Sequence, residues 1–463
     1  MKDFIIDFDN NAGANLYEQI YERFRTDIES GVMPRGVKMP SLRMLAASNG
    51  ISITTVETAY NQLLVEGYIV SRPKSGYYVS DDISPVADTG DAKGDEFCET
   101  DCARDQQLLF DEESFDFSRW KKSMNKVFNT YSHLLRTEAE IQGESMLRSE
   151  IAQYLYSARG VRCHPRQIVV GAGSQQITTL LTKIFQKVGI SNAAIETPGY
   201  GPIREIFKDE GFSMHMVPVD EKGIEIEELP LIRSVIYVSP SNQYPTGSVM
   251  PVARRYELIR WAEDNDSYVL EDDYDSELRY FGKPVPAMKS LGSGERIIYL
   301  GSFSSTLFAG IRISYVVLPD ALTEPWNYIS DKYDQGCSKT EQLCLAIYMQ
   351  EGYYVKGIKK CRKLYASKLQ GTIGAFREHG GDLISTVDSK SGLAITLRIR
   401  TTVPAADLCK AARRLGLLMN PVDDLCTDDE QVLCFYFYRV SETMLKILIK
   451  QYITSIRRYV ERR

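Results

Sequence analysis

A chain of 463 residues is too long for a single hydrophobic core and suits a small domain joined to a larger one. The net charge of -7 excludes a strongly basic nucleic-acid-binding protein, so any DNA affinity must come from a local arrangement of residues. The nine cysteines are odd in number and scattered along the chain, which argues against a secreted disulfide framework. The sequence shows no leader peptide and no long apolar run. We therefore expect a cytoplasmic protein with reduced thiols and no membrane span.

Residues 16–65 have the apolar spacing and the capping residues of three helices. Ser41 is a natural N-cap for a short second helix that ends at Asn49-Gly50, and Ser52 caps a third helix that Gly67 ends. Two helices joined by a short turn predict a helix-turn-helix. The first helix is predicted from apolar residues at helical spacing, at Leu16, Ile20, Phe24 and Ile28.

Two short strands, residues 68–70 and 77–79, are predicted on either side of the turn Pro73-Lys74-Ser75-Gly76. Residues 16–79 as a whole resemble the winged-helix domain of GntR-type bacterial regulators, with the signatures Pro40-Ser41-x-Arg43 and Thr55-Val56-x-x-Ala59-Tyr60. The resemblance implies that the third helix enters the major groove of double-stranded DNA and that the hairpin lies along its backbone as a wing.

The same resemblance implies a set of DNA-contacting residues. Many family members have an arginine where this chain has Ile53, so one polar contact is missing and operator choice is expected to differ. A pair of charges in a turn is often only solvated, but the winged-helix context favours phosphate contacts for the two wing residues. The implied residues are Arg43, Ser52, Thr54, Thr55, Asn61, Arg72 and Lys74.

Residues 81–112 are interpreted as a linker, because most of this segment is acidic, turn-rich and poor in large apolar residues. The predicted domains are therefore a DNA-binding domain at residues 1–80 and a large domain at residues 113–463. Cys98 and Cys102 share a short spacing in the linker, but nothing nearby completes a metal site, and no metal is predicted.

From residue 113 the pattern alternates between helices and apolar strands, which predicts an α/β fold with a central, mostly parallel sheet. Most of the strands are followed by turns with polar residues, where open α/β sheets bind their ligands. The expected strands are residues 168–170, 193–196, 235–238, 268–270, 297–300 and 314–318.

Two of these turns could bind a ligand, but each could also have a purely structural role. Gly171-Ala172-Gly173-Ser174-Gln175-Gln176 opens an apolar helix whose N-terminus could hold a phosphate, although a glycine-rich turn alone is more often only tight. The acidic run at residues 271–277 could be a solvated face. It follows the apolar Val269-Leu270 directly, however, so we predict that Asp272 points inward.

Together with SPSNQYPTG at residues 239–247 and IIYLGSFSSTLFAGIRISYVVL at residues 297–318, these turns resemble the cofactor site of fold-type-I aminotransferases, which use pyridoxal phosphate. The resemblance implies that Tyr200 stacks on the cofactor ring and that Asn242 and Tyr274 approach its phenolic oxygen. Asp272 would face the pyridine nitrogen and keep it protonated. The phosphate cradle would comprise Gly173, Ser174, Gln175, Ser302, Ser304 and Arg312.

Ser305 stands where this family has the lysine that binds the cofactor, 33 residues after Asp272 and seven before Arg312. A serine has no nitrogen for a Schiff base and, unassisted, is a poor base, so no catalytic residue is predicted. Lys283 and Lys289 are the nearest lysines, but they precede the strand and do not replace the missing one. If the serine was introduced by engineering, the natural protein is expected to bind the cofactor covalently.

A winged helix linked to an aminotransferase-like domain resembles the MocR group of GntR regulators over nearly the whole chain. This implies a transcription factor for amino-acid, amine or vitamin B6 metabolism that forms a head-to-tail homodimer and senses pyridoxal phosphate or a pyridoxal-amino compound. Arg439 would hold a ligand carboxylate, or is a surface arginine. The alternatives are a regulator that no longer binds the cofactor, and a working aminotransferase with an appended DNA-binding domain.

Overall fold

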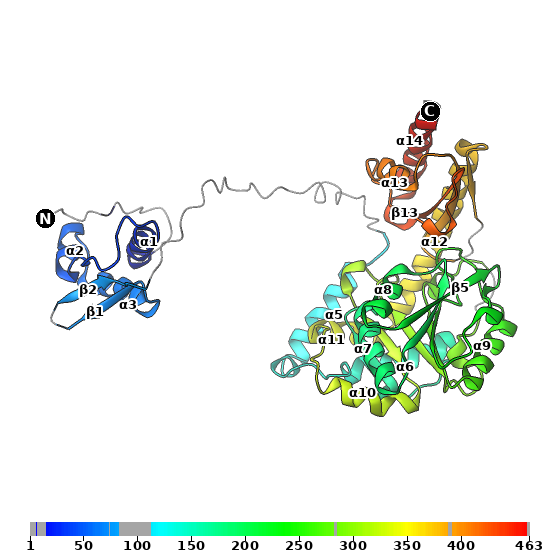
Figure 1. Ribbon diagram of the computed structural model, residues 1–463, viewed down its shortest axis with the longest axis horizontal. Coiled ribbons are helices and arrows are strands. Elements are labelled where there is room, and N and C mark those ends of the chain that lie inside the picture. Colours follow the sequence, from blue (N-terminus) through cyan, green and yellow to red (C-terminus); the bar gives the residue numbers. More distant parts are fainter. Residues whose placement is uncertain are drawn as a thin grey trace. The chain divides into compact units, whose positions relative to one another are not determined.

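The computed structural model describes residue 6 and residues 15–73, 75–82, 113–281, 285–387 and 391–460, without the side chains of residues 458–460. The chain divides into two compact units, Met1–Asp101 and Cys102–Arg463 (Figure 1). Residues 83–112, Cys98 and Cys102 among them, lie outside the described residues, as do Lys74 and Lys283. The linker and its bounds at residues 81 and 112 therefore stay a prediction.

The described part of the first unit folds into a helix-turn-helix followed by a hairpin. Its helices are α1 (Leu16–Glu29), α2 (Leu42–Asn49) and α3 (Ile53–Val65), and its antiparallel strands are β1 (Ile69–Arg72) and β2 (Gly76–Val79). The elements agree with the predicted ones. The hairpin is longer than predicted because Arg72 pairs with Gly76 directly at the turn.

Capping and one aromatic cluster fix the position of α3. The Ser52 Oγ accepts a hydrogen bond from the Thr55 N–H at 3.0 Å, and the Ser41 Oγ accepts one from the Met44 N–H at 3.3 Å, as the N-cap prediction required. The buried ring of Tyr60 packs edge-on against Phe24 at 5.7 Å, and its hydroxyl donates to a backbone oxygen 3.0 Å away. One side of α3 is thus held in the core while the other stays exposed.

In the second unit, eight strands form one sheet in the order β3-β10-β9-β8-β7-β4-β5-β6. The strands β9, β8, β7, β4 and β5 run parallel, whereas β10 is antiparallel to both of its neighbours and β6 is antiparallel to β5. The six predicted strands are all present, and β5 and β6 were not predicted. The bounds are β3 (Ile168–Gly171), β4 (Asn192–Thr197), β5 (Ser213–Asp220), β6 (Gly223–Ile224), β7 (Val235–Val238), β8 (Tyr268–Asp272), β9 (Ile297–Ser302) and β10 (Ser314–Val317).

Helices cover both faces of this sheet (Figure 1). Successive residues of a strand face opposite sides of the sheet. In β9, Ile298 and Leu300 pack with α7 (Ser174–Lys187), α8 (Gly201–Asp209) and α10 (Thr323–Ser330), while Tyr299 between them packs with α6 (Ser145–Arg159) and α11 (Lys339–Gln350). Further helices are α5 (Phe117–Thr130), beside α11, and α9 (Val252–Asp264), against β7 and β8. Burial on both faces explains the continuous apolar runs of these strands.

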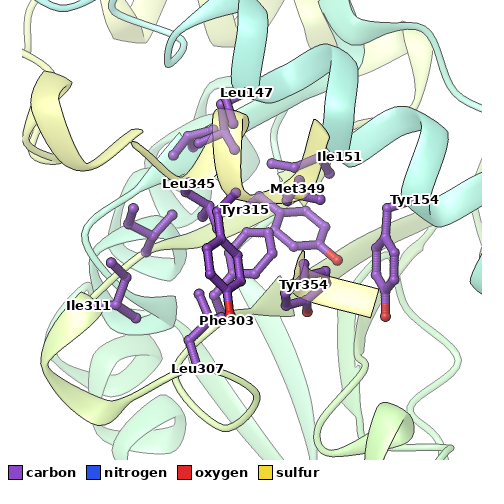
Figure 2. Packing of buried hydrophobic residues seen from close by; sticks show 14 of the residues in the cluster. Leu147, Ile151, Tyr154, Phe303, Leu307, Ile311, Tyr315, Leu345, Met349 and Tyr354 are labelled. Atoms are coloured by element: carbon purple, nitrogen blue, oxygen red, sulfur yellow. The ribbon is translucent and has the colours of Figure 1, made fainter. Parts of the chain in front are cut away.

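Figure 2 shows part of the apolar cluster that holds the turn after β9. Phe303 is fully buried and Leu307 is 7% exposed, and both belong to this cluster. Thr306 shares a hydrogen bond of 3.0 Å with the hydroxyl of Tyr354. Because its neighbours on both sides are packed, the backbone at Ser305 is fixed by the core.

After α12 (Tyr353–Gly380), the chain forms a smaller antiparallel sheet in the order β11-β12-β14-β13. Its strands are β11 (Ile384–Thr386), β12 (Ala394–Arg400), β13 (Met419–Pro421) and β14 (Glu430–Tyr436), and it packs with α12, α13 (Ala405–Arg413) and α14 (Glu442–Val460) (Figure 1). No helix among the described residues has both the length and the apolar character needed to cross a membrane.

Candidate functional site

A cavity of about 260 Å³ lies in the second unit, where the parallel strands end. Side chains reach it from the ends of β7, β8 and β9, from the first residue of α7, and from β10 and β14. This edge of an open α/β sheet is the usual place for a ligand. The lining residues are Ser174, Tyr200, Tyr237, Ser239, Tyr244, Asp272, Asp273, Tyr274, Asp275, Ser302, Ser304, Ser305, Arg312, Ser314 and Tyr436.

Most of the residues predicted from the turns meet in this cavity, although they come from segments far apart in the sequence. Gly173 lies directly before the lining residue Ser174, whereas Gln175 is exposed on the first turn of α7 and does not line the cavity. Asn242 is buried beside the cavity, where its Oδ1 accepts a hydrogen bond from Ser391 at 3.0 Å. The predicted residues in the lining are Ser174, Tyr200, Asp272, Tyr274, Ser302, Ser304 and Arg312, together with Ser305.

One end of the cavity is suited to an anion. The N-terminus of α7 and Arg312 lie together: a Cβ on Gly173 would stand 2.4 Å from the Arg312 Nη2. Only a glycine permits this approach, and its φ of 99° favours glycine as well. No carboxylate of the described residues lies within ion-pair distance of Arg312, and the buried Ser304 Oγ has no hydrogen-bond partner among them. Free helix N–H groups, a guanidinium and a hydroxyl make a phosphate-sized anion site.

Whereas the Arg312 end of the cavity suits an anion, the surroundings of Asp272 suit a cation. Burial raises its pKa to about 7, the neighbouring Asp273 and Asp275 add to the rise, and a hydrogen bond from the Tyr237 hydroxyl to its Oδ2 opposes it. A carboxyl group with such a pKa gains from a cationic partner, which would return it to the charged form. The inward position predicted for Asp272 is the one that the structure has.

Asp273 has a structural role despite its place in the lining. Its Oδ1 lies 2.7 Å from the Arg159 Nη2, and its Oδ2 accepts hydrogen bonds from Ser276 and from the hydroxyl of Tyr299. Burial favours the neutral acid, but the charge of Arg159 and these hydrogen bonds hold the pKa of Asp273 below its usual value. This buried pair is neutralised internally and offers no free charge to a ligand.

Three tyrosines form an aromatic wall. The ring of Tyr244 stands edge-on to Tyr200 at 6.0 Å and edge-on to Tyr274 at 6.5 Å. Its hydroxyl lies 3.3 Å from that of Tyr436. The wall offers ring faces and edges to a flat ligand.

Ser305 and Asp275 line the cavity together. Asp275 is 2% exposed, and its Oδ2 accepts a hydrogen bond from the Leu393 N–H at 3.1 Å, whereas its Oδ1 has no partner among the described residues. Burial raises the pKa of Asp275 to about 6, and the Ser305 hydroxyl is the leading group that opposes the rise. None of the cavity's lining residues is a lysine, and the buried Lys289 bonds backbone oxygens elsewhere.

Sequence reasoning missed several lining residues. Tyr237 lies within a predicted strand but looks like an ordinary core residue there, and Tyr436 reaches the cavity from the second sheet. Asp275 was seen only as one acid in a run. The signal that could have found it is its position one residue after Tyr274, in a segment already predicted to face inward.

Arg439 is not among the lining residues of the cavity. Strand β14 ends at Tyr436, and Arg439 closes a short 3-10 helix, Phe437–Arg439, where its Nε donates to the Tyr438 hydroxyl at 3.0 Å. The side chain is half-buried and its guanidinium lies 5.6 Å from the centre of the Tyr438 ring. This placement gives the ligand-carboxylate role no support.

In the first unit, the residues expected to contact DNA differ in how free they are. Arg43, Thr54 and Asn61 are exposed. Ile53, which stands where many family members have an arginine, is exposed as well. Ser52 and Thr55 bond each other at 2.8 Å as well as capping α3, so part of their polar capacity serves the helix. Arg72 is exposed and stacks over Tyr78 at 4.4 Å, with Asp81 at 3.7 Å, so the wing arginine is already positioned.

Comparison with protein families divides the chain in the same way. Residues 16–79 match the family described as "Bacterial regulatory proteins, gntR family", and residues 106–435 match "Aminotransferase class I and II". The second match covers most of the chain and includes the strands that surround the cavity.

Three curated relatives share nearly the whole architecture. The uncharacterized HTH-type transcriptional regulator YdeL of Bacillus subtilis is 36% identical over 88% of this chain and 89% of its own. The probable rhizopine catabolism regulatory protein MocR of Rhizobium meliloti is 30% identical over 89% and 88%. The pyridoxine biosynthesis transcriptional regulator PdxR of Corynebacterium glutamicum is 30% identical over 81% and 82%.

Solved structures support the fold of the large unit. A kynurenine aminotransferase from Pyrococcus horikoshii superposes with a TM-score of 0.65 at 23% identity, over 75% of this chain and 90% of that one. At this identity the likeness concerns the fold alone.

Proposed function

This chain belongs to the MocR-type branch of the GntR family, whose members join a helix-turn-helix domain to an aminotransferase-like domain and are transcriptional regulators, and on that premise we propose that its cavity binds a pyridoxal-phosphate ligand without a covalent bond. The observation that carries this proposal is the pairing of two chemistries in one cavity. An anion site at Gly173 and Arg312 lies at one end, and Asp272 with a raised pKa lies in the same lining.

The phosphate end fits the group that it would hold. Ser304 has a buried hydroxyl without a partner among the described residues, and Arg312 has no carboxylate partner among them. A bound phosphate would accept hydrogen bonds from both and from the first N–H groups of α7. The glycine at 173 leaves the space that this geometry needs.

The ring end fits as well. A pyridinium N–H would donate to Asp272, and the positive charge would bring the raised pKa of that carboxyl back down. Tyr200 would stack on the ring, Tyr274 would approach its phenolic oxygen, and Asn242 would act from behind the lining. Bound pyridoxal phosphate supplies an electron-withdrawing ring and an aldehyde that reacts with amines.

Ser305 restricts the chemistry that we expect of this site. We assign it to the position of the cofactor lysine, where a serine cannot bond the aldehyde or carry a proton as an amine does. Transamination is therefore not expected, and the domain acts as a sensor for pyridoxal phosphate or a pyridoxal-amino compound. The roles of the relatives MocR, in rhizopine catabolism, and PdxR, in pyridoxine biosynthesis, support control of amino-acid, amine or vitamin B6 metabolism.

DNA binding would use α3 as the recognition helix, with the wing along the backbone. Arg43, Thr54 and Asn61 have the exposed polar groups for this task. We further propose a head-to-tail homodimer in the cytoplasm, since two half-sites would provide the affinity that the acidic chain lacks.

The direct test is retention of the ligand. Purified full-length protein is mixed with pyridoxal phosphate, freed of unbound ligand, and its absorbance is recorded with and without borohydride. We expect a retained band that borohydride does not fix to the protein. A fixed band would mean that some lysine substitutes for Ser305, and no band would mean that the pocket has lost the cofactor.

A matched pair of variants shows whether the retained ligand is in this cavity. Arg312→Ala should abolish retention, because the phosphate loses its only guanidinium in the lining. The control Arg413→Ala removes an exposed arginine on α13 and should leave retention unchanged. Retention that survives Arg312→Ala would contradict the assignment of the phosphate end.

A further inference from the structure

Among the described residues, no cation balances the carboxylate of Asp275, which lies beside Ser305. Asp275 is 2% exposed and lines the cavity, yet its Oδ1 has no hydrogen-bond partner among the described residues. A buried polar atom left unpaired carries a cost in free energy, and the cost is larger for an ionised group. Because Asp275 lines a ligand cavity, its unpaired oxygen indicates the chemistry of the missing partner.

The surrounding charges do not supply that partner. Two buried cations lie next to this segment: Arg159 is engaged by Asp273 at 2.7 Å, and Arg255 lies 3.9 Å from Glu271. Arg312 belongs to the anion site, where it approaches Gly173. Within the part of the chain that the structure describes, the cavity lining thus holds Asp272 and Asp275 without a matching cation, and a neutral Ser305 stands next to Asp275.

The backbone holds Asp275 in place. Its φ of 54° is unusual for a residue other than glycine, and the Leu393 N–H fixes its Oδ2 from the segment before β12. Strained backbone conformations cluster at ligand sites, where the surrounding structure holds them. The carboxylate is therefore presented to the cavity at a fixed position.

We propose that this pocket selects the amine form of the B6 phosphates, with a protonated nitrogen on the carbon that a lysine at position 305 would have bonded, and that Asp275 is the residue that selects it. The ligand ammonium would donate to the Asp275 Oδ1 and to the Ser305 Oγ. Pyridoxamine 5'-phosphate is the simplest such compound. This inference rests on the proposed function, since it takes the phosphate and ring ends as assigned there.

The aldehyde form fits the same position less well. An aldehyde oxygen is an acceptor and would face a carboxylate that is also an acceptor. An ammonium is a donor with an opposite charge, and hydrogen bonds between charged groups are about twice as strong as neutral ones. Ser305 leaves the room that the ammonium needs, because a lysine side chain is absent.

The test compares three ligands on the full-length protein by isothermal titration calorimetry: pyridoxamine 5'-phosphate, pyridoxal 5'-phosphate and pyridoxine 5'-phosphate. All three share the phosphate and the ring nitrogen and differ only at the carbon in question. We expect the amine to bind about tenfold more tightly than either of the others. Equal affinities, or tighter binding of the aldehyde, would overturn the inference.

Asp275→Asn isolates the charge. Asparagine tolerates a positive φ and can still accept from the Leu393 N–H. The affinity for the amine should fall about tenfold, while that for pyridoxine 5'-phosphate should change less than threefold. The control Asp264→Asn removes an exposed carboxylate at the end of α9 and should change neither. If Asp275→Asn leaves the affinity for the amine unchanged, the assigned role is contradicted.

A measurement on the unaltered protein guards against a variant that fails to fold. The pKa of Asp275 is raised to about 6, so lowering the pH from 7.5 to 5.5 protonates it and should shrink the advantage of the amine over pyridoxine 5'-phosphate. Asp272, Tyr274, Tyr280 and Cys434 also face Asp275. Asp272 also titrates in this range, but it is assigned to the ring nitrogen that both ligands share, whereas Asp275 is assigned to the carbon at which they differ. A fall in the ratio that Asp275→Asn removes therefore reports on Asp275. A ratio that does not fall would count against the inference.

The outcomes separate the two proposals. If none of the three ligands binds, the proposed function fails together with this inference. If all three bind equally and Asp275→Asn is silent, the proposed function stands and the selection of an amine is wrong.

Discussion

Ser305 replaces a long cationic side chain, by our assignment, with a short neutral one at a position that the core holds in place. Phe303 and Leu307 are buried on either side of it (Figure 2). Thr306 shares a hydrogen bond with the hydroxyl of Tyr354. The packing of the turn therefore does not depend on which side chain stands at 305. By this assignment, the difference from an aminotransferase would rest in Ser305 and in Asp275, which lines the cavity beside it.

Restoring a lysine tests this view. Ser305→Lys should convert retained pyridoxal phosphate into a form that borohydride fixes to the chain, because the turn already points residue 305 into the cavity. The mass of the reduced protein should rise by one pyridoxyl group. The control Ser293→Lys places a lysine in an exposed loop and should fix none. Failure of fixation would show that Ser305 is not at the lysine position.

At the scale of elements, the start of α7 is the most constrained part of the site. Gly173 has a φ of 99°, and a Cβ there would lie 2.4 Å from the Arg312 Nη2. Gly173→Ala should therefore weaken pyridoxal phosphate binding at least tenfold by displacing the arginine or straining the helix start.

The matched control is Gly374→Ala within α12, where an added Cβ meets no atom within 4 Å. This change should leave ligand affinity unaltered and raise stability by about 0.5–1 kcal/mol, the usual gain for alanine over glycine within a helix. Calorimetric titration and thermal unfolding measure the two effects. Unchanged affinity in Gly173→Ala would contradict the phosphate cradle.

Helix α3 allows recognition to be separated from folding. Asn61→Ala should weaken binding to operator DNA about tenfold with no loss of stability, because Asn61 is exposed. Ser52→Ala should instead lower stability by about 1 kcal/mol, since its hydroxyl caps the helix through the Thr55 N–H. Fluorescence anisotropy and thermal melts check both. If Asn61→Ala binds like the unaltered protein, α3 does not read the DNA through this residue.

Elements with a strong local pattern could be predicted from the sequence. The helix-turn-helix was readable because Ser41 and Ser52 mark helix starts, and the central strands because burial on both faces makes them continuously apolar. Strand β5 was missed because most of its side chains are at least partly exposed, with only Val217 of its nonpolar residues buried. Its composition therefore resembles that of a loop.

The site could be predicted only where a turn carried its own signal. Asp272 and Arg312 follow or precede recognisable strands, and both line the cavity. Tyr436 could not be found in this way, because a second sheet brings it to the cavity from a distant segment. The ligand role of Arg439 gains no support because β14 ends at Tyr436 and the chain turns before reaching it.

At the scale of the whole molecule, a net charge of -7 makes DNA binding depend on a few local contacts. The exposed Arg43 and Arg72 supply cationic groups on the first unit, and binding should weaken steeply as salt is raised. A ligand in the second unit can control this binding only if it binds the DNA-bound state with a different affinity from the free state.

The central claim is that one chain joins DNA binding to a B6-phosphate pocket. The most direct measurement is the affinity for DNA from upstream of the protein's own gene, at low salt, with and without saturating pyridoxamine or pyridoxal 5'-phosphate. We predict at least a fivefold change on adding ligand, and Arg312→Ala should bind DNA as the unliganded protein does without responding. No DNA binding, or identical affinity with and without either ligand, would contradict the account.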